Sequence, residues 1–336
     1  MSLISINENG LYCKQGDFYI DPWKPVKEAL ITHAHSDHMR WGMKHYITHQ
    51  HSIPVLRHRL GSDNAVDGVE YGEKFYLNGV EISYHPAGHI IGSAQIRLAY
   101  ENEVWLFTGD YKIADDGVSQ PYEPIPCDHL ITESTFGMPI YKFPNFGEVY
   151  ADINAWWRVN AEEGLNTVLL AYALGKAQNI LAHLDESIGE IYLHGAVANT
   201  NEALAEVGYA FPGKRLTTDI DRTKIRGAII VAPPSALDTP WMRKLKPYRS
   251  AMCSGWMQLR GARRRRNVDR GFVLSDHCDW NQLQQALQFM QPKHVYVTHG
   301  YEAVFSRFVK EQYHIPADIF KTLYNDQEEE EEEALS

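Results

Sequence analysis

Histidine and aspartate are concentrated in one short segment, His33-Ala34-His35-Ser36-Asp37-His38. Imidazole and carboxylate groups suit zinc, or alternatively manganese or iron, and this combination without cysteine is typical of a hydrolytic metal site. Because side chains alternate along an extended chain, we expect His33 and His35 to point the same way, while a turn carries Asp37 and His38 to a second position. The segment therefore predicts ligands for two metal ions, although a histidine-rich surface loop is the simpler alternative.

Two ions need more ligands than one loop supplies, and three further candidates lie at the ends of strand-like runs. His89 and Asp110 each follow a glycine directly, which allows the backbone to turn sharply where a strand ends. His299 ends a third apolar run. A single histidine at a strand end is more often structural. Together with the segment 33–38, however, these residues predict a two-metal site.

The elements that must position these residues follow from periodicity. Short β-rich runs fill the first third of the sequence and begin at Phe18, Ala29, Lys74, Ala94 and Val104. From Phe146 onwards, helical spacing alternates with apolar runs, which is typical of a parallel sheet covered by helices. Helices are predicted over 148–164, 176–189 and 302–313, and strands over 167–174 and from Ile191, Ala228, Phe272 and Val295.

A length of 336 residues exceeds what one hydrophobic core usually supports, so two compact units or one unit with a large insertion are expected. The net charge is −11, but ten Lys or Arg residues and one acidic residue lie between Trp241 and Arg270. This basic segment predicts phosphate contact despite the negative total, although a charge run is usually only a solvated surface. The glutamates Glu328 to Glu333 predict a disordered tail over 325–336.

No apolar run is long enough to span a membrane, and the start of the sequence has no secretory signal, which predicts a cytoplasmic protein without membrane contact. The four cysteines are far apart and form no CxxC pair, which argues against disulfides and thiolate metal clusters. Cys278 adjoins His277, so a nucleophilic role is one interpretation of this cysteine, and packing is the simpler one.

The combination of these motifs resembles the metallo-β-lactamase superfamily, and two more segments resemble its β-CASP branch, which acts on nucleic acids. These are residues 131–137, with Glu133, and residues 274–280, with His277. The resemblance implies an α/β fold, in which an αββα metallo-β-lactamase sandwich carries the metals and an α/β β-CASP domain is inserted. The implied boundaries place the sandwich at 1–145 and 271–324 and the inserted domain at 146–270.

The resemblance also implies roles for individual residues. Asp21, at the end of a strand-like run, matches a carboxylate that steadies the ligand segment, although it could simply cap a turn before Pro22. His277, paired with Glu133, is the implied proton donor to the leaving alkoxide, and these two residues with Asp37 form the implied catalytic group. The implied ligands of the first ion are His33, His35 and His89. Those of the second ion are Asp37, His38 and His299, and Asp110 is the implied bridge between the two ions.

Within the inserted domain, the resemblance implies a groove for the substrate. Lys176 follows a glycine where an apolar strand passes into a helix, a place that suits a phosphate. Ser254, Gly255 and Trp256 offer a hydroxyl, backbone amides and an aromatic face for a base, although core packing explains Trp256 equally well. The predicted contacts with the phosphate backbone are arginines of the basic segment: Arg260, Arg263, Arg264, Arg265 and Arg266.

Motifs from about Leu11 to Tyr324 resemble, in particular, the bacterial ligase-associated DNA exonucleases. This implies a DNA exonuclease that uses two divalent ions, zinc or alternatively manganese. It also implies a role in DNA repair, on single strands or duplex ends, with cleavage from the 5′ end as one of the possible polarities. A DNA ligase and a helicase are the implied functional partners. An RNA nuclease is the alternative, because mRNA 3′-end-processing enzymes share these motifs. A small-molecule hydrolase of the superfamily would lack the Glu133 and His277 motifs, and a binding module without activity would not keep every metal position filled.

Overall fold

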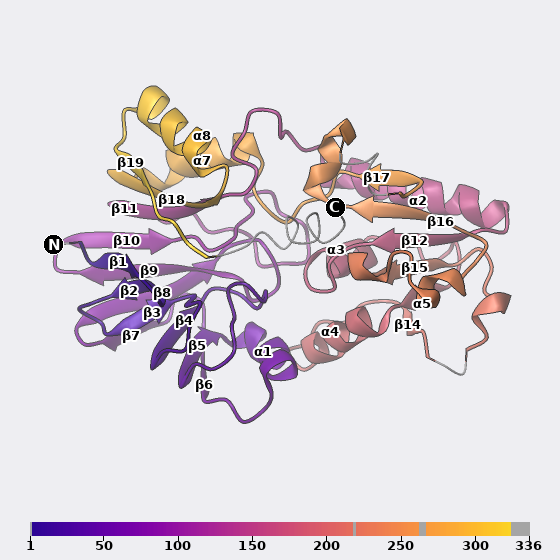
Figure 1. Ribbon diagram of the computed structural model, residues 1–336, viewed down its shortest axis with the longest axis horizontal. Helices are drawn as coiled ribbons and strands as arrows, with labels where there is room; N and C mark the ends of the chain where they lie inside the picture. Colours follow the sequence, from indigo (N-terminus) through magenta and orange to yellow (C-terminus); the bar gives the residue numbers. More distant parts are fainter. Residues whose placement is uncertain (1, 218–219, 262–266, 324–336) are drawn as a thin grey trace. The chain divides into compact units, whose positions relative to one another are not determined.

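The computed structural model describes residues 2–217, 220–261 and 267–323, and the chain forms two compact units (Figure 1). The first unit contains the chain up to Tyr141 and again from Asp276, and the second contains Lys142–Ser275. The boundaries expected from the sequence, at residues 146 and 270, lie a few residues inside this insertion. Of the sequence-based predictions, Arg263 to Arg266 and the acidic tail lie outside the described residues.

The first unit contains two sheets. One has the strand order β1-β2-β3-β4-β5-β6, with antiparallel pairs up to β3 and parallel pairs from there on. Its strands are β1 (Ile4–Asn7), β2 (Gly10–Cys13), β3 (Phe18–Ile20), β4 (Glu28–Ile31), β5 (His45–His49) and β6 (Val66–Val69). Helix α1 (Ile53–Leu60) lies between β5 and β6 in the chain.

The other sheet has the order β19-β18-β11-β10-β9-β8-β7. An antiparallel meander leads from β7 to β10, and β11, β18 and β19 continue the sheet in parallel. Its strands are β7 (Lys74–Leu77), β8 (Val80–Pro86), β9 (Ala94–Tyr100), β10 (Glu103–Phe107), β11 (His129–Ser134), β18 (His294–Gly300) and β19 (Ala317–Ile319).

The side chains of β10 show how this second sheet is buried on both faces. Trp105 and Phe107 belong to the core that joins the two sheets, whereas Leu106 between them packs with the helices α7 (Trp280–Met290) and α8 (Glu302–Phe308). This alternation is the period of two that a strand imposes. The first unit therefore has a layer of helices on one of two stacked sheets, and the fourth layer of an αββα sandwich stays a prediction.

The second unit is built on one parallel sheet of order β14-β13-β15-β12-β16-β17, as the sequence predicted for this region. The strands are β12 (Asn166–Leu170), β13 (Ile191–Leu193), β14 (Lys214–Arg215), β15 (Ile229–Ala232), β16 (Tyr248–Cys253) and β17 (Arg270–Phe272), and the helices are α2 (Phe146–Glu162), α3 (Lys176–Ala182), α4 (Gly195–Ala205) and α5 (Pro240–Arg243). Residues of α2, α3 and α4 pack with β12, β13 and β15 in one hydrophobic core.

One predicted helix is longer than the observed one, and another has the predicted extent but changes type along its length. The helix predicted over 176–189 ends at Ala182, because Asp185 accepts hydrogen bonds from the amide and hydroxyl of Ser187 and so forms a local turn. The helix predicted over 302–313 passes at Val309 into a π-helical turn, η5 (Val309–Tyr313), and stops at His314, whose φ of 57° is left-handed.

All four cysteines are free, buried thiols. Cys278 belongs to the core beneath α7, and burial, reinforced by the charge of Glu133, raises its thiol pKa well above the ordinary value. A protonated, enclosed thiol is not a nucleophile, so the structure favours packing. Among the described residues, no helix has the length and apolarity needed to cross a membrane.

Gly88 shapes the turn between β8 and His89. Its φ is +73°, and a Cβ at this position would lie 2.1 Å from the carbonyl oxygen of Lys112. Gly88→Ala is therefore expected to lower the free energy of unfolding by about 2–4 kcal/mol, since a clash with backbone adds to the cost of a left-handed alanine. Chemical denaturation measures this loss.

Gly72→Ala is the matched control. Its φ of +77° is equally left-handed, but no atom lies within 4 Å of the added Cβ, so it should lose only about 1 kcal/mol. Equal losses in the two variants would contradict the steric explanation.

Candidate active site

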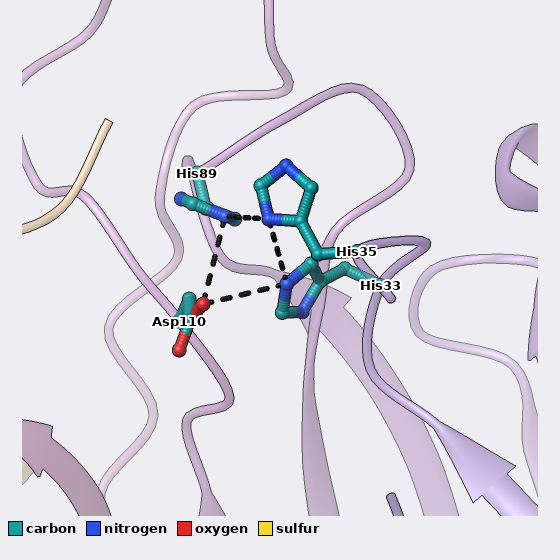
Figure 2. A group of neighbouring side chains, drawn as sticks. All are labelled: His33, His35, His89 and Asp110. Carbon is teal, nitrogen blue, oxygen red and sulfur yellow. Dashed lines mark hydrogen bonds and ion pairs between the residues drawn. The ribbon is translucent and has the colours of Figure 1, made fainter. Parts of the chain in front are cut away.

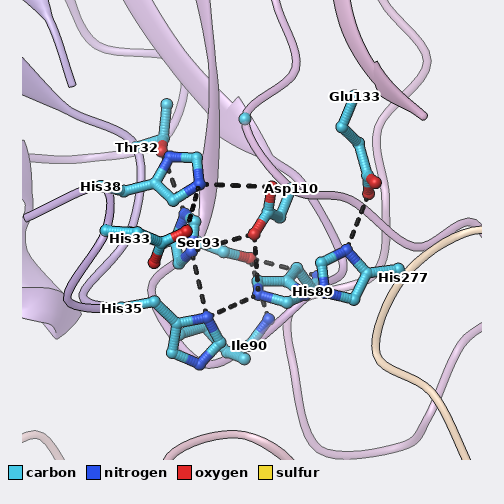
Figure 3. A network of polar contacts seen from close by, with 12 residues as sticks. Thr32, His33, His35, His38, His89, Ile90, Ser93, Asp110, Glu133 and His277 are labelled. Atoms are coloured by element: carbon cyan, nitrogen blue, oxygen red, sulfur yellow. Dashed lines mark hydrogen bonds and ion pairs between the residues drawn. The ribbon is translucent and has the colours of Figure 1, made fainter. Parts of the chain in front are cut away.

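The ends of several strands of the first unit bring the predicted metal ligands together. The segment 33–38 follows β4, His89 follows β8, Asp110 follows β10, and His299 lies near the end of β18. Figure 3 shows His33, His38 and His89 around the carboxylate of Asp110. His33, His38 and His89 are fully buried, and Asp110 is almost so. The structure thus gathers residues from four places in the sequence into one enclosed polar centre.

A first group contains His33, His35, His89 and Asp110 (Figure 2). The Nδ1 atom of His35 lies 3.2 Å from Nε2 of His33 and 3.1 Å from Nε2 of His89. Oδ2 of Asp110 lies 3.4 Å from Nε2 of His33 and 3.7 Å from Nε2 of His89. Tetrahedral zinc, with bonds of about 2.0–2.1 Å, separates its ligand atoms by roughly 3.3 Å, so these four atoms fit around one ion.

The protonation of this first group also fits a cation. Burial, followed by the charges of neighbouring imidazoles, lowers the pKa of His33 and His35 well below the ordinary value, and burial is also the main cause of the lowered pKa of His89. These imidazoles are therefore neutral, which is the form that binds metals. The nitrogens that converge here outnumber the protons available for hydrogen bonds between them, so their lone pairs are suited to binding a cation.

A second group contains His38, Asp110 and His299. Oδ1 of Asp110 lies 3.1 Å from Nε2 of His299 and 3.4 Å from Nε2 of His38, whereas its Oδ2 faces the first group. Asp37 stands at the edge, with Oδ2 3.5 Å from Nε2 of His38. One carboxylate thus offers a different oxygen to each group, which is the geometry of a bridging ligand.

The carboxylates of this second group attract positive charge. Burial alone would lower the pKa of His38 and His299, but Asp110, together with Asp37 at His38, outweighs burial and raises both pKa values. Burial raises the pKa of Asp37, which faces the like charge of Asp110. Buried carboxylates in such proximity need nearby cations, so a divalent ion fits this group as well.

Asp21 lies behind both groups and is fully buried. Its Oδ1 accepts the Thr32 amide at 2.8 Å, and its Oδ2 accepts the Thr32 hydroxyl at 2.6 Å and Nδ1–H of His38 at 2.7 Å. The Thr32 hydroxyl, having donated to Asp21, can only accept from Nδ1–H of His33, 3.0 Å away. Asp21 therefore orients one ligand of each group and contacts the ligand segment rather than the turn at Pro22.

Other candidate ligands have similar supports, which were not predicted from the sequence. The Thr298 hydroxyl donates to the carbonyl of Thr132 and so accepts from Nδ1–H of His299 at 3.2 Å. Nδ1–H of His89 donates to the carbonyl of Asp276 at 2.9 Å. Such contacts fix the tautomer that presents Nε2 to a metal. The repeated Thr-His dipeptide was a usable sequence signal for two of these supports, whereas the backbone of Asp276 gives none.

Glu133 and His277, predicted from separate motifs, form a buried ion pair with Oε1 and Nδ1 3.0 Å apart. The Glu133 carboxylate also accepts the amides of Tyr111 and Thr135 at 3.3 and 3.0 Å. Burial opposes the charged form of His277, but Glu133 and Asp110 outweigh it and raise the His277 pKa well above the ordinary value. His277 is therefore an imidazolium beside the metal-ligand groups, where its ring lies 4.7 Å from that of His89.

In the second unit, two predicted contacts follow the carboxyl ends of neighbouring inner strands of the sheet. Neighbouring strands β12 and β16 lead at their carboxyl ends to the loops of Lys176 and Ser254, and their connections then run in opposite directions along the sheet. Such a switch point is the usual ligand position in an open α/β sheet. Lys176 is 2% exposed, with Nζ 4.7 Å from the ring centre of Tyr172.

The other predicted contacts of the second unit differ in exposure. The Ser254 hydroxyl caps η4 (Gly255–Gln258) by accepting the Trp256 amide at 3.2 Å. Trp256 is only 5% exposed, which favours the core-packing alternative over stacking on a base. Arg260 is exposed, which leaves its side chain accessible to a phosphate.

Several known proteins are similar to the chain. A probable DNA ligase from Opitutus terrae is 31% identical over 312 residues, which is 90% of this chain and 30% of that protein. The cleavage and polyadenylation specificity factor 73 of Drosophila melanogaster is 21% identical over 369 residues, 90% of this chain and 54% of that protein. The endoribonuclease YSH1 of Yarrowia lipolytica is 32% identical over 166 residues, 47% of this chain and 20% of that protein. The chain spans only part of each relative.

A crystal structure of a protein of unknown function from Enterococcus faecalis V583 has a TM-score of 0.62 to this chain, with 11% identity and coverage of 89% of this chain and 80% of that one. At this identity, the likeness shows a shared fold alone. No protein-family model matches the chain. The sequence relatives support the resemblance to the β-CASP nucleases.

Asp21→Ala should weaken zinc binding by about 10- to 100-fold, because His38 and the Thr32–His33 pair lose the acceptor that orients them. A competition titration of the purified protein with a chromophoric zinc chelator measures the affinity without any assumption about activity.

Asp116→Ala provides the control for losing a buried aspartate in the same unit. Asp116 is 5% exposed and caps a turn by accepting the amides of Val118 and Ser119, outside both ligand groups. Unchanged zinc affinity in Asp21→Ala, or an equal loss in both variants, would contradict an orienting role for Asp21.

Proposed function

We propose that this chain is a metal-dependent phosphodiesterase of the β-CASP branch of the metallo-β-lactamase superfamily, and that it degrades DNA from an end. The observation that carries the proposal is the Asp110 carboxylate, which presents one oxygen to each ligand group with the His277 imidazolium beside it. Phosphodiester hydrolysis needs an activated water, charge stabilisation at phosphorus and a proton for the leaving group. The geometry supports all three requirements.

The ligand groups would hold two divalent cations, zinc or alternatively manganese, which when bound supply an activated water and stabilise charge on the phosphoryl oxygens. His277 supplies the proton. Its Nδ1–H remains hydrogen-bonded to the Glu133 carboxylate, so the proton that moves is the one on Nε2. This proton passes to the leaving oxygen as the phosphorus–oxygen bond breaks. Glu133 keeps the ring charged and oriented, and Asp21 keeps His33 and His38 in place.

DNA is the preferred substrate in this proposal because the relative that covers 90% of the chain at 31% identity carries the name of a DNA ligase. The proposed setting is DNA repair in the cytoplasm, in functional association with a ligase and a helicase. Lys176, Ser254 and the arginines of the basic segment are the proposed contacts of the second unit, which is the proposed β-CASP insertion. RNA is the second candidate, supported by the similarity to an endoribonuclease and to a polyadenylation factor.

Purified protein with added zinc or manganese should digest linear single-stranded DNA and leave a circular DNA of the same sequence intact. Oligonucleotides labelled at either end report the polarity, and matched RNA tests the second candidate. Cleavage of the circle would contradict the exonuclease proposal, and a preference for RNA would replace DNA as the substrate.

Asp110→Ala and His277→Ala should separate metal binding from cleavage. The first variant loses metal and activity together, because both groups lose a ligand. The second keeps its metal and loses about 100- to 10,000-fold in kcat, the usual contribution of a positioned general acid. Metal content, kcat and the unfolding midpoint are measured on the same preparations. A His277→Ala protein that binds metal and retains full activity would refute the general-acid role, and one that merely unfolds earlier would indicate a structural role.

A further inference from the structure

Arg59, in the last turn of α1, reaches the ligand segment from outside. Its Nη1 donates a hydrogen bond of 2.5 Å to the carbonyl of Ala34, the residue between His33 and His35. The residue is nevertheless exposed to solvent. The residue is thus exposed as a whole, while burial around the guanidinium itself lowers the pKa of Arg59, so the charged group is fixed at the rim of the ligand segment rather than free in solvent.

The charge of Arg59 has little compensation from the protein. A guanidinium carries five N–H donors, and the described residues provide one hydrogen-bond acceptor for them and no ion pair. Its charge nonetheless reaches the site, since it is felt by both Asp37 and His35. In a chain with 43 acidic residues, an arginine that is held in place without a carboxylate partner is suited to an anion from outside.

We propose that Arg59 binds a non-bridging oxygen of the nucleic-acid phosphate that lies at or next to the bond to be cleaved. This inference rests on the proposed function and adds a substrate-binding residue to it. Guanidinium groups match phosphate through two parallel N–H donors. Because the Ala34 carbonyl fixes one end of the fork relative to His33 and His35, the remaining donors hold the phosphate in register with the ligand groups.

The test compares Arg59→Ala with the wild type on single-stranded DNA that carries one neutral methylphosphonate linkage, placed at successive positions. At the position that Arg59 contacts, this linkage should lower kcat/KM of the wild type by about 10- to 100-fold. Arg59→Ala should lose a similar factor on unmodified DNA and nothing further at that position, because the contact is already absent. Zinc content should equal that of the wild type.

Arg57→Ala is the matched control, since it removes the same charge from an exposed residue of the same helix. Residues two apart on a helix do not face the same way, so this variant should behave like the wild type at every position. Additive losses in Arg59→Ala at all positions, or a loss of zinc together with activity, would overturn the proposal and leave Arg59 as a support of the segment.

Binding of the unmodified oligonucleotide separates this inference from the proposed function. Losing one phosphate contact should lower the slope of log affinity against log salt by about 0.7 in Arg59→Ala and leave it unchanged in Arg57→Ala. If this difference in slope is found but the wild type cleaves no nucleic acid, the phosphodiesterase proposal is disproved and the Arg59 contact is retained. Equal slopes in all three proteins would reject the contact.

Discussion

The charge balance around Asp110 is the constraint on which the centre of the first unit depends. Burying a carboxylate among imidazoles is unfavourable unless each group has a partner of opposite charge or a hydrogen bond. Asp110 meets the condition by dividing its oxygens between the two groups, and the remaining imidazoles are held from behind by Asp21, Thr298 and the carbonyl of Asp276. These contacts fix the orientation of the side chains around Asp110.

The fold supplies this arrangement through strand ends. Two sheets share one core, and the loops that leave β4, β8, β10 and β18 meet beside it. The turns before His89 and Asp110 require backbone conformations that glycine adopts readily, with φ values of +73° and +55° at Gly88 and Gly109. Rigid strands and tight turns therefore set the positions of the ligands, whereas the proposed chemistry depends on the side chains that these turns present.

Much of this centre could be predicted from the sequence because its candidate ligands carry local signals. The spacing within residues 33–38 and the glycines before His89 and Asp110 are visible without a structure, and the structure brings these residues together. The supports were harder to find, because they depend on contacts between distant parts of the chain. The Asp276 carbonyl acts on a ligand 187 residues away, and Arg59 acts through a backbone oxygen. The early end of α3 was missed because the turn at Asp185 competes locally with an otherwise helical pattern.

The order of these residues along the chain has a consequence for biosynthesis. His33 to Asp110 come before the second unit, whereas Asp276, His277 and His299 come after it. A ribosome therefore exposes most of the ligands long before the last histidine of the second group and the imidazolium beside Glu133 have been translated. Until then, the nascent chain lacks the proton donor and cannot carry out the proposed hydrolysis.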